Sequence, residues 1–244
     1  LAFPSAEGLA LLTLPRPDRR NALSKVLLGQ LAQQLRQVPA LGVHAVVIQG
    51  ADGFFSAGAD LADLQGSLAD TYYDDQVAAA VDAIRAAPVP VIASIEGGCI
   101  GAALDLALAC DFQVVAEGAF LELPAIRMGI LYNPSALARM GRRLPAATLS
   151  RLLLAGDRTG AGAAVAAGLA PHGAADGGAL ARASQLAQRM GQLPRRAVEK
   201  TKQFIGALGA PALDMPVWEQ ARQELVASPA RAEAVRRNQA RPGT

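Results

Sequence analysis

The chain has 244 residues and a formal net charge of +2 at pH 7, with 52% apolar and 18% charged residues. This length allows one large domain or two modest ones, and the near-balanced charge gives no electrostatic reason to expect binding to nucleic acid or a membrane surface. Cys99 and Cys110 lie in apolar surroundings without CxxC spacing, no apolar run approaches the roughly 20 residues that span a bilayer, and no secretory leader is visible, so we expect a cytoplasmic protein with reduced thiols.

The first two thirds of the sequence alternate short β-like runs with helical ones. Apolar runs predict strands at 9–14, 45–50, 89–98 and 112–117. The spacing of apolar residues predicts helices at 24–38, 74–87 and 98–111. Ser24 is the expected N-cap of the first helix, and Pro88 ends the second. This alternation is typical of an α/β fold with mostly parallel strand pairing.

The last third of the sequence reads as almost entirely helical. Thr159 is the expected N-cap of a short helix, and Gly168 its C-terminal stop. Three further helices are predicted at 194–208, 212–228 and 229–240. The second carries an apolar stripe, which favours burial in the core and, as the next possibility, packing on another subunit. The stripe includes Val217, Trp218, Leu225 and Val226.

Two Gly/Ala-rich loops, 55–61 and 96–102, each follow a predicted strand and precede a predicted helix. The first N–H groups of a helix lack internal partners, and two of them converging on one oxygen form an oxyanion hole. From spacing alone, two tight turns that need small residues are the favoured interpretation of the pattern. Asp105 lies in the apolar stretch after the second loop, where an unpaired buried charge is costly.

These loops and their surroundings resemble the crotonase superfamily, the enoyl-CoA hydratase/isomerase family. The resemblance rests on the order and spacing of "PRPDRRNALS", "GFFSAGADL", "PVIASIEGGCIGAALDLALACDF", "LPAIRMGI" and "LLLAGDRTGAGAAVAAGLA". It implies a ββα spiral core over 1–190 that binds acyl-CoA. It also implies a C-terminal helical region over 191–244 that assembles homotrimers or hexamers.

The resemblance also implies site residues. Two backbone N–H groups of this family bind a thioester oxygen and stabilise an enolate, and here they match Ala59 and Ala102. Asp105 matches a catalytic acid. The positions that match the coenzyme A path, with the two donors included, are Ala22, Leu23, Ala57, Ala59, Asp60, Leu61, Ala62 and Ala102. For Asp60 an N-cap role is the favoured interpretation. No metal and no separate cofactor are expected, because coenzyme A enters as part of the substrate.

One departure from the family pattern bears on the reaction. Ala125 stands where hydratases of the family carry a second glutamate, and alanine cannot transfer a proton. If residues 120–123 are extended, Glu122 lies on the face opposite Leu123 and reaches the pocket only through a bulge. Tyr132 and Asn133 fall where some isomerases carry an acid, and either could hydrogen-bond a substrate or water.

We therefore expect an enoyl-CoA hydratase, with isomerisation or other enolate chemistry by one carboxylate as the first alternative. A non-catalytic acyl-CoA-binding protein is the second, and an assembly module using only the helical tail is the third. A dehydrogenase lacks its glycine fingerprint here, and the distant His44 and His172 exclude a multi-histidine metal site. Tyr72 and Tyr73, in the loop 61–76, could line the acyl pocket, cover it or lie on the surface.

Overall fold

Nine short strands form two sheets in the computed structural model, which describes residues 5–6, 8–208 and 213–239. The main sheet has the order β1-β2-β3-β4-β6-β9, and all its pairs are parallel except β1–β2. Its strands are β1 (Ser5–Ala6), β2 (Leu9–Leu14), β3 (Ala45–Gly50), β4 (Val91–Ile95), β6 (Phe112–Ala116) and β9 (His172–Ala174). The second sheet contains β5 (Gly98–Ile100), β7 (Phe120–Glu122) and β8 (Thr159–Gly160). The predicted parallel α/β fold is confirmed.

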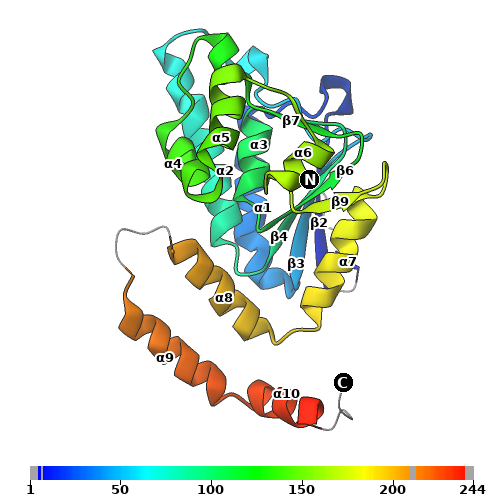
Figure 1. Cartoon of the computed structure of the whole chain (residues 1–244), viewed down its shortest axis with the longest axis vertical. Helices are drawn as coiled ribbons and strands as arrows, with labels where there is room; N and C mark the ends of the chain where they lie inside the picture. Colours follow the sequence, from blue (N-terminus) through cyan, green and yellow to red (C-terminus); the bar gives the residue numbers. More distant parts are fainter. Residues whose placement is uncertain (1–4, 7, 209–212, 240–244) are drawn as a thin grey trace.

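Helices cover both sides of the main sheet. The α-helices of the described chain are α1 (Lys25–Gln37), α2 (Thr71–Ala86), α3 (Ala102–Ala109), α4 (Pro134–Arg143), α5 (Ala146–Ser150), α6 (Ala161–Ala166), α7 (Ala179–Gly191), α8 (Arg195–Ala207), α9 (Met215–Val226) and α10 (Pro229–Gln239). Helix α7 contacts β3, β4 and β6, while α1, α2 and α3 form a contacting row away from it (Figure 1). As predicted, the Ser24 hydroxyl caps α1, accepting a hydrogen bond from the Leu27 N–H. Within the described ranges, no helix is both long and apolar enough to cross a membrane.

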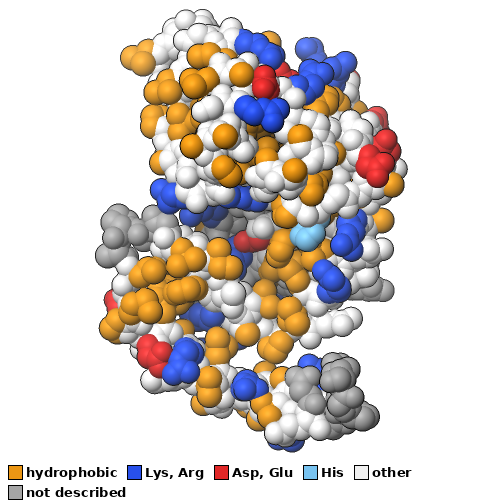
Figure 2. Space-filling view, viewed as in Figure 1, with side chains coloured by type: hydrophobic (Ala, Val, Ile, Leu, Met, Phe, Trp, Pro, Cys, Tyr) orange, Lys and Arg blue, Asp and Glu red, His pale blue; other side chains and the backbone are white. Residues whose placement is uncertain are grey.

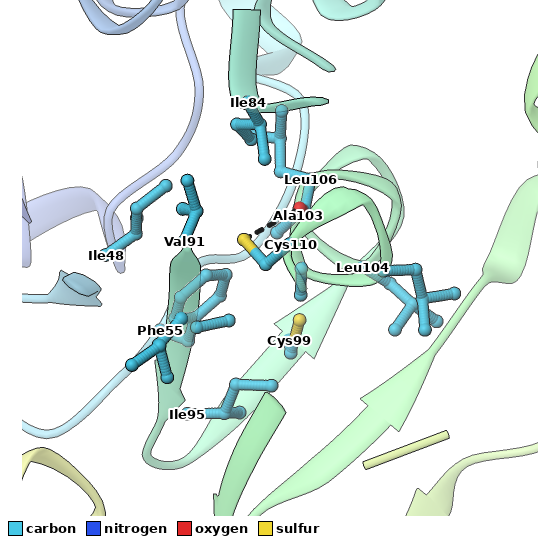
Figure 3. Close-up of a cluster of buried hydrophobic side chains, with 14 of the residues drawn as sticks. Ile48, Phe55, Ile84, Val91, Ile95, Cys99, Ala103, Leu104, Leu106 and Cys110 are labelled. Atoms are coloured by element: carbon cyan, nitrogen blue, oxygen red, sulfur yellow. Dashed lines mark hydrogen bonds between the residues drawn. The ribbon is translucent and has the colours of Figure 1, made fainter. Parts of the chain in front are cut away.

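The core lies between the main sheet and the helices α2 and α3. Figure 3 shows its buried side chains meeting around Cys99 and Cys110. The Cys110 thiol donates a hydrogen bond to the Leu106 carbonyl oxygen at 3.4 Å. Desolvation by burial raises the pKa of both thiols, so neither is an accessible thiolate at neutral pH. Each fully buried Leu or Ile side chain contributes about 1.5–3 kcal/mol of transfer free energy.

The stretch 89–111 differs from its prediction. The predicted strand ends at Ile95, and residues 98–100, expected to be helical, form β5 of the second sheet. Gly97 (φ +56°) and Gly101 (φ +58°) adopt left-handed backbone conformations on either side of β5. These turns redirect the chain twice within five residues, which apolar periodicity cannot reveal.

The last third contains two strands that the sequence analysis missed. Thr159 begins β8 and does not cap the short helix, because Gly160 holds the N-cap position of α6. Gly168, with φ +71°, is the left-handed stop that was predicted. Strand β9 pairs with β6 and extends the main sheet at its edge. Strands of two or three residues carry no detectable alternation of their own.

The C-terminal helices α8, α9 and α10 project from the body of the molecule (Figure 1). Lys202 of α8 anchors them by donating to the Val89 carbonyl oxygen at 2.9 Å and pairing with Asp111 at 2.7 Å. A groove of about 790 Å³ lies between α8, the end of α3 and the start of β6. The favoured core interpretation of the α9 stripe is wrong for the single chain, since Val217 and Val226 are 54% and 57% exposed. Residues 209–212 and 240–244 of this predicted region lie outside the described ranges.

Candidate functional site

Asn21 links two segments that precede the first Gly/Ala loop, 16–23 and 51–54, through side-chain hydrogen bonds. It is fully buried, with a left-handed backbone (φ +55°). Its side-chain amide donates to the carbonyl oxygens of Ala51 and Phe54 at 2.9 and 2.6 Å. Its side-chain oxygen accepts from the Arg16 N–H at 3.0 Å. These bonds fix the chain at 16–23 against the turn at 51–54, so that Leu23 lies beside the loop.

A parallel bridge between Leu23 and Ala59 sets the direction of the Ala59 amide. The Leu23 N–H donates to the Gly58 carbonyl oxygen at 2.7 Å, and the Asp60 N–H donates to the Leu23 carbonyl oxygen at 3.1 Å. In such a bridge the middle residue, Ala59, turns its own N–H away from the partner strand. The Ala59 N–H therefore points away from Leu23.

On its other side the loop lies against the second Gly/Ala loop. Ser56 bridges to this segment, because its N–H donates to the Gly98 carbonyl oxygen at 3.0 Å and its carbonyl oxygen accepts from the Ile100 N–H at 3.1 Å. Gly58 has φ +86°, and a Cβ placed on it would lie 2.4 Å from the Ile100 carbonyl oxygen and 3.5 Å from the Ala102 nitrogen. The two loops thus meet at Gly58, which directly precedes Ala59 and lies close to the Ala102 amide nitrogen.

Both of these amides lack an acceptor in the part of the chain that the structure describes. Ala102 is the first residue of α3, whose N-cap is Gly101, and the first N–H groups of a helix have no internal partner. The positive end of the helix dipole lies at the same place. The arrangement can stabilise negative charge on a ligand oxygen.

Asp60 follows Ala59 and has a structural role, as the sequence analysis favoured. Its carboxylate pairs with Arg16 at 2.6 Å and caps a 3-10 helix, Leu61–Asp63, by accepting from the Ala62 N–H at 3.2 Å. The Arg16 hydrogen bond is the main reason why the pKa of Asp60 is lowered. Of the other residues predicted on the coenzyme A path, Leu61 and Ala62 are exposed and Ala57 is half-buried. Ala22 and Leu23 are buried.

Asp105 lies one turn after Ala102 on α3, and is only 2% exposed. Its carboxylate accepts a short hydrogen bond from the Arg139 guanidinium of α4 and a 3.5 Å bond from the Tyr132 hydroxyl. Desolvation raises the pKa of Asp105, while the charge of Arg139 and these two hydrogen bonds oppose the rise. The carboxylate of Asp105 is therefore paired, and the pair offsets part of the cost of burying its charge.

A small cavity adjoins the Asp105 carboxylate. Its volume of about 10 Å³ is close to the space that one water molecule needs. Residues of α2, α3, α4 and the segment before α4 form its walls. They are Asp74, Val77, Ala78, Asp105, Tyr132, Asn133, Ser135 and Arg139.

Glu122 does not belong to this cavity. It is buried, and its carboxylate pairs with Arg127 at 2.5 Å and Arg158 at 3.2 Å. Two arginines pair with this carboxylate outside the cavity, which agrees with the expectation that it faces away from the pocket. Ala125, in the 3-10 helix Pro124–Met128, is half-buried and packs on the core.

Two charged residues of the cavity escaped the sequence analysis, Asp74 and Arg139. Arg139 is one of three arginines on α4, and sequence spacing does not tell which of them turns inward. Asp74 belongs to an Asp-rich stretch whose other members are solvent-facing or cap a helix start. Of the neighbouring tyrosines, Tyr73 is buried and donates from its hydroxyl to the Leu23 carbonyl oxygen at 2.8 Å, while Tyr72 is exposed.

Comparisons with known proteins agree with this geometry. Residues 5–229 match the family model described as "Enoyl-CoA hydratase/isomerase". The "Probable enoyl-CoA hydratase echA6" of Mycobacterium bovis is 31% identical over 210 residues, which cover 86% of this chain and 84% of that protein. The "2,3-dehydroadipyl-CoA hydratase" of Escherichia coli is 36% identical over 203 residues, covering 82% of this chain and 78% of that protein.

Solved structures give the same result. An enoyl-CoA hydratase/isomerase family protein from Hyphomonas neptunium superposes with a TM-score of 0.89 at 28% identity, over 100% of this chain and 96% of that one. An enoyl-CoA hydratase from Streptomyces coelicolor superposes with a TM-score of 0.90 at 27% identity, over 99% and 92% of the two chains. Together these likenesses confirm the fold predicted from the sequence.

Proposed function

The chain belongs to the enoyl-CoA hydratase/isomerase family, the crotonase superfamily, and we propose that it is an enoyl-CoA hydratase that binds its thioester oxygen between the Ala59 and Ala102 amides. The observation that supports this most is the meeting of the two loops at Gly58, with both amides free of acceptors among the described residues. Backbone donors of this kind are already oriented before the substrate arrives, so they stabilise the charge that develops without a cost of reorganisation.

Asp105 is the group that we propose for proton transfer. It lies one turn from the Ala102 amide, and its raised pKa brings it closer to the range in which a carboxyl group exchanges protons. The pairing with Arg139 favours its charged form, which is the form that accepts a proton.

The coenzyme A path runs, in this proposal, over the exposed surface beside Ala59. Leu61 and Ala62 offer an accessible apolar edge directly after the donor. The residues assigned to the path are Ala22, Leu23, Ala57, Ala59, Asp60, Leu61, Ala62 and Ala102, with Asp60 acting through its cap on the Ala62 N–H.

The test is incubation of the wild-type protein with crotonyl-CoA and, separately, with a 3-enoyl-CoA. Hydration removes the absorbance of the conjugated thioester in the first reaction, and isomerisation creates it in the second. We expect loss of absorbance from crotonyl-CoA and a reduction of kcat by about 10²-fold or more in Asp105→Asn. Turnover of neither substrate would rule out the enzyme.

A second function, acyl-CoA binding without turnover, is supported by Ala125, which cannot transfer a proton, and by the ion pair between Arg139 and Asp105. Calorimetry combined with the absorbance assays distinguishes this second function from the hydratase. Calorimetry would then detect crotonyl-CoA binding that Asp105→Asn leaves unchanged, while neither absorbance assay responds.

We also propose that the chain assembles into a homotrimer or hexamer through its C-terminal helices. Figure 2 shows hydrophobic side chains exposed over α8 and α9. Those that are large and more than half exposed are Ile205, Leu208, Met215, Val217 and Val226. Light scattering after size exclusion measures the assembly. A wild-type monomer at micromolar concentration would contradict the proposal, and Val217→Glu is expected to weaken the assembly.

A further inference from the structure

The wall opposite Asp105 in the small cavity carries a second carboxylate, Asp74 of α2. Asp74 and Asp105 line the same space, which holds about one water molecule, so a single bridging water can reach both. Asp74 is half-buried. No hydrogen bond or ion pair joins it to any residue that the structure describes. Asp74 lies in the first turn of α2, where the helix dipole favours a negative charge, and no cation pairs with it among the described residues.

We propose that Asp74 is the second acid of this site and supplies the proton-carrying group that Ala125 lacks. This inference rests on the proposed function. It assigns the missing role to a different helix, α2, whose Val77 and Ala78 form the apolar wall beside Asp74.

The surroundings of the two carboxylates indicate which one is the base and which one is the acid. Arg139 lies against Asp105 and favours its charged form, so Asp105 is the base. Desolvation first, and then the charges of Asp75, Asp70 and Asp105, raise the pKa of Asp74. The groups that face Asp74 from the other walls are Asp105, the neutral Tyr132 hydroxyl and Arg139, whose charge is engaged by Asp105. We assign the proton that the pair shares to Asp74, because Arg139 pairs with Asp105 and not with Asp74.

The hydration step then balances. A water molecule gives one proton to the Asp105 carboxylate while its oxygen bonds to C3 of the enoyl group. The C2–C3 π pair moves toward the thioester oxygen, which the Ala59 and Ala102 amides stabilise as an enolate. The enolate returns its electron pair to C2, which takes the proton of the Asp74 carboxyl group. The proton now on Asp105 passes through water in the cavity to Asp74, and both groups regain their initial states.

The experiment compares Asp74→Asn with Asp82→Asn, using crotonyl-CoA across a range of pH. Asp82 lies on the same helix but is exposed and makes no contact with the cavity, so it controls for loss of a charge on α2. We expect Asp74→Asn to lower kcat about 10²-fold or more with KM within about threefold. It should also remove the fall in kcat at high pH that deprotonation of Asp74 causes in the wild type. Asp82→Asn should keep the wild-type kcat and pH profile, and Asp74→Glu should restore part of the activity.

The failures of the two proposals are distinguishable. If the wild type is active and Asp74→Asn retains its kcat and both limbs of its pH profile, the inference alone is overturned. A uniform loss of kcat without a change in the shape of the pH profile also overturns it, because a merely structural role would have that effect. If the wild type converts neither substrate, the proposed function fails and the inference with it.

Discussion

Replacing Gly58 by alanine tests the contact between the two loops directly. A Cβ at this position would lie 2.4 Å from the Ile100 carbonyl oxygen, and Cβ atoms in proteins essentially never lie closer than 3.0 Å to such an atom. The obstacle is backbone, so it cannot rotate away as a side chain would. The loops must separate by at least about 0.6 Å, and this movement acts on both sides of the proposed oxyanion hole.

The size of the effect follows from this displacement. A misplacement of about 1 Å at a reacting centre costs about 10²-fold in rate, and loss of one oxyanion donor costs about 10²–10³-fold in kcat. We therefore expect Gly58→Ala to lower kcat for crotonyl-CoA by about 10²-fold. The left-handed backbone adds a folding cost of about 1–3 kcal/mol for any residue other than glycine.

Gly42→Ala separates the catalytic effect from the folding cost. Gly42 has φ +68°, but a Cβ there meets nothing within 4 Å, and it lies in the turn after α1, outside the site. Both variants should lose conformational stability in urea unfolding, and Gly58→Ala should lose more because of the added overlap with Ile100, whereas only Gly58→Ala should lose activity. If folded Gly58→Ala keeps kcat/KM within about threefold of wild type, the contact at Gly58 does not position the catalytic amides.

Three further predictions concern buried charges. Lys202→Met removes the anchor of α8 on Asp111 and should lower the free energy of unfolding by about 3 kcal/mol, measured in urea. Arg139→Gln leaves Asp105 buried without its cation, which should raise the pKa of Asp105 further and destabilise the protein by about 3 kcal/mol at pH 8. This loss should shrink toward pH 4, where the carboxyl group takes up a proton. Asp74→Asn should increase the Tm at pH 8, because the folded state raises the pKa of Asp74, and the increase should fall as the pH drops through that pKa.

Much of the scaffold could be predicted because its signals are local. The apolar runs at 9–14 and 45–50 are strands with the predicted bounds, and Ser24 caps the helix that it was expected to cap. The resemblance to the family correctly identified two loops that meet in space, although they are about 40 residues apart in the sequence. Spacing alone favours two separate tight turns, since nothing in the composition of the loops indicates the distance between them.

The rest depended on long-range geometry. Asp105 was identified as a candidate, but the arginine that pairs with it comes from α4, 34 residues further along the chain. The residues 98–100 read as part of an apolar helix, and only their pairing with β7 makes them a strand. The stripe on α9 has the periodicity of a core helix, yet only part of it is covered: Trp218 packs on Phe204 of α8, while Val217 and Val226 remain exposed. Periodicity reports that a face is apolar and not which partner buries it.

The site follows one physical arrangement, in which charge is permitted inside the protein only where a partner or a proton accompanies it. Glu122 pairs with two arginines, and Asp105 pairs with one arginine and has a cavity beside it. Asp74 forms no ion pair among the described residues, and desolvation and the neighbouring acids raise its pKa, so the folded protein binds a proton there at a pH at which the unfolded chain has released it. Stability is consequently lost as the pH rises between the two pKa values. A fold does not need such a cost for its own stability, whereas proton transfer between two carboxyl groups with different affinities for a proton does.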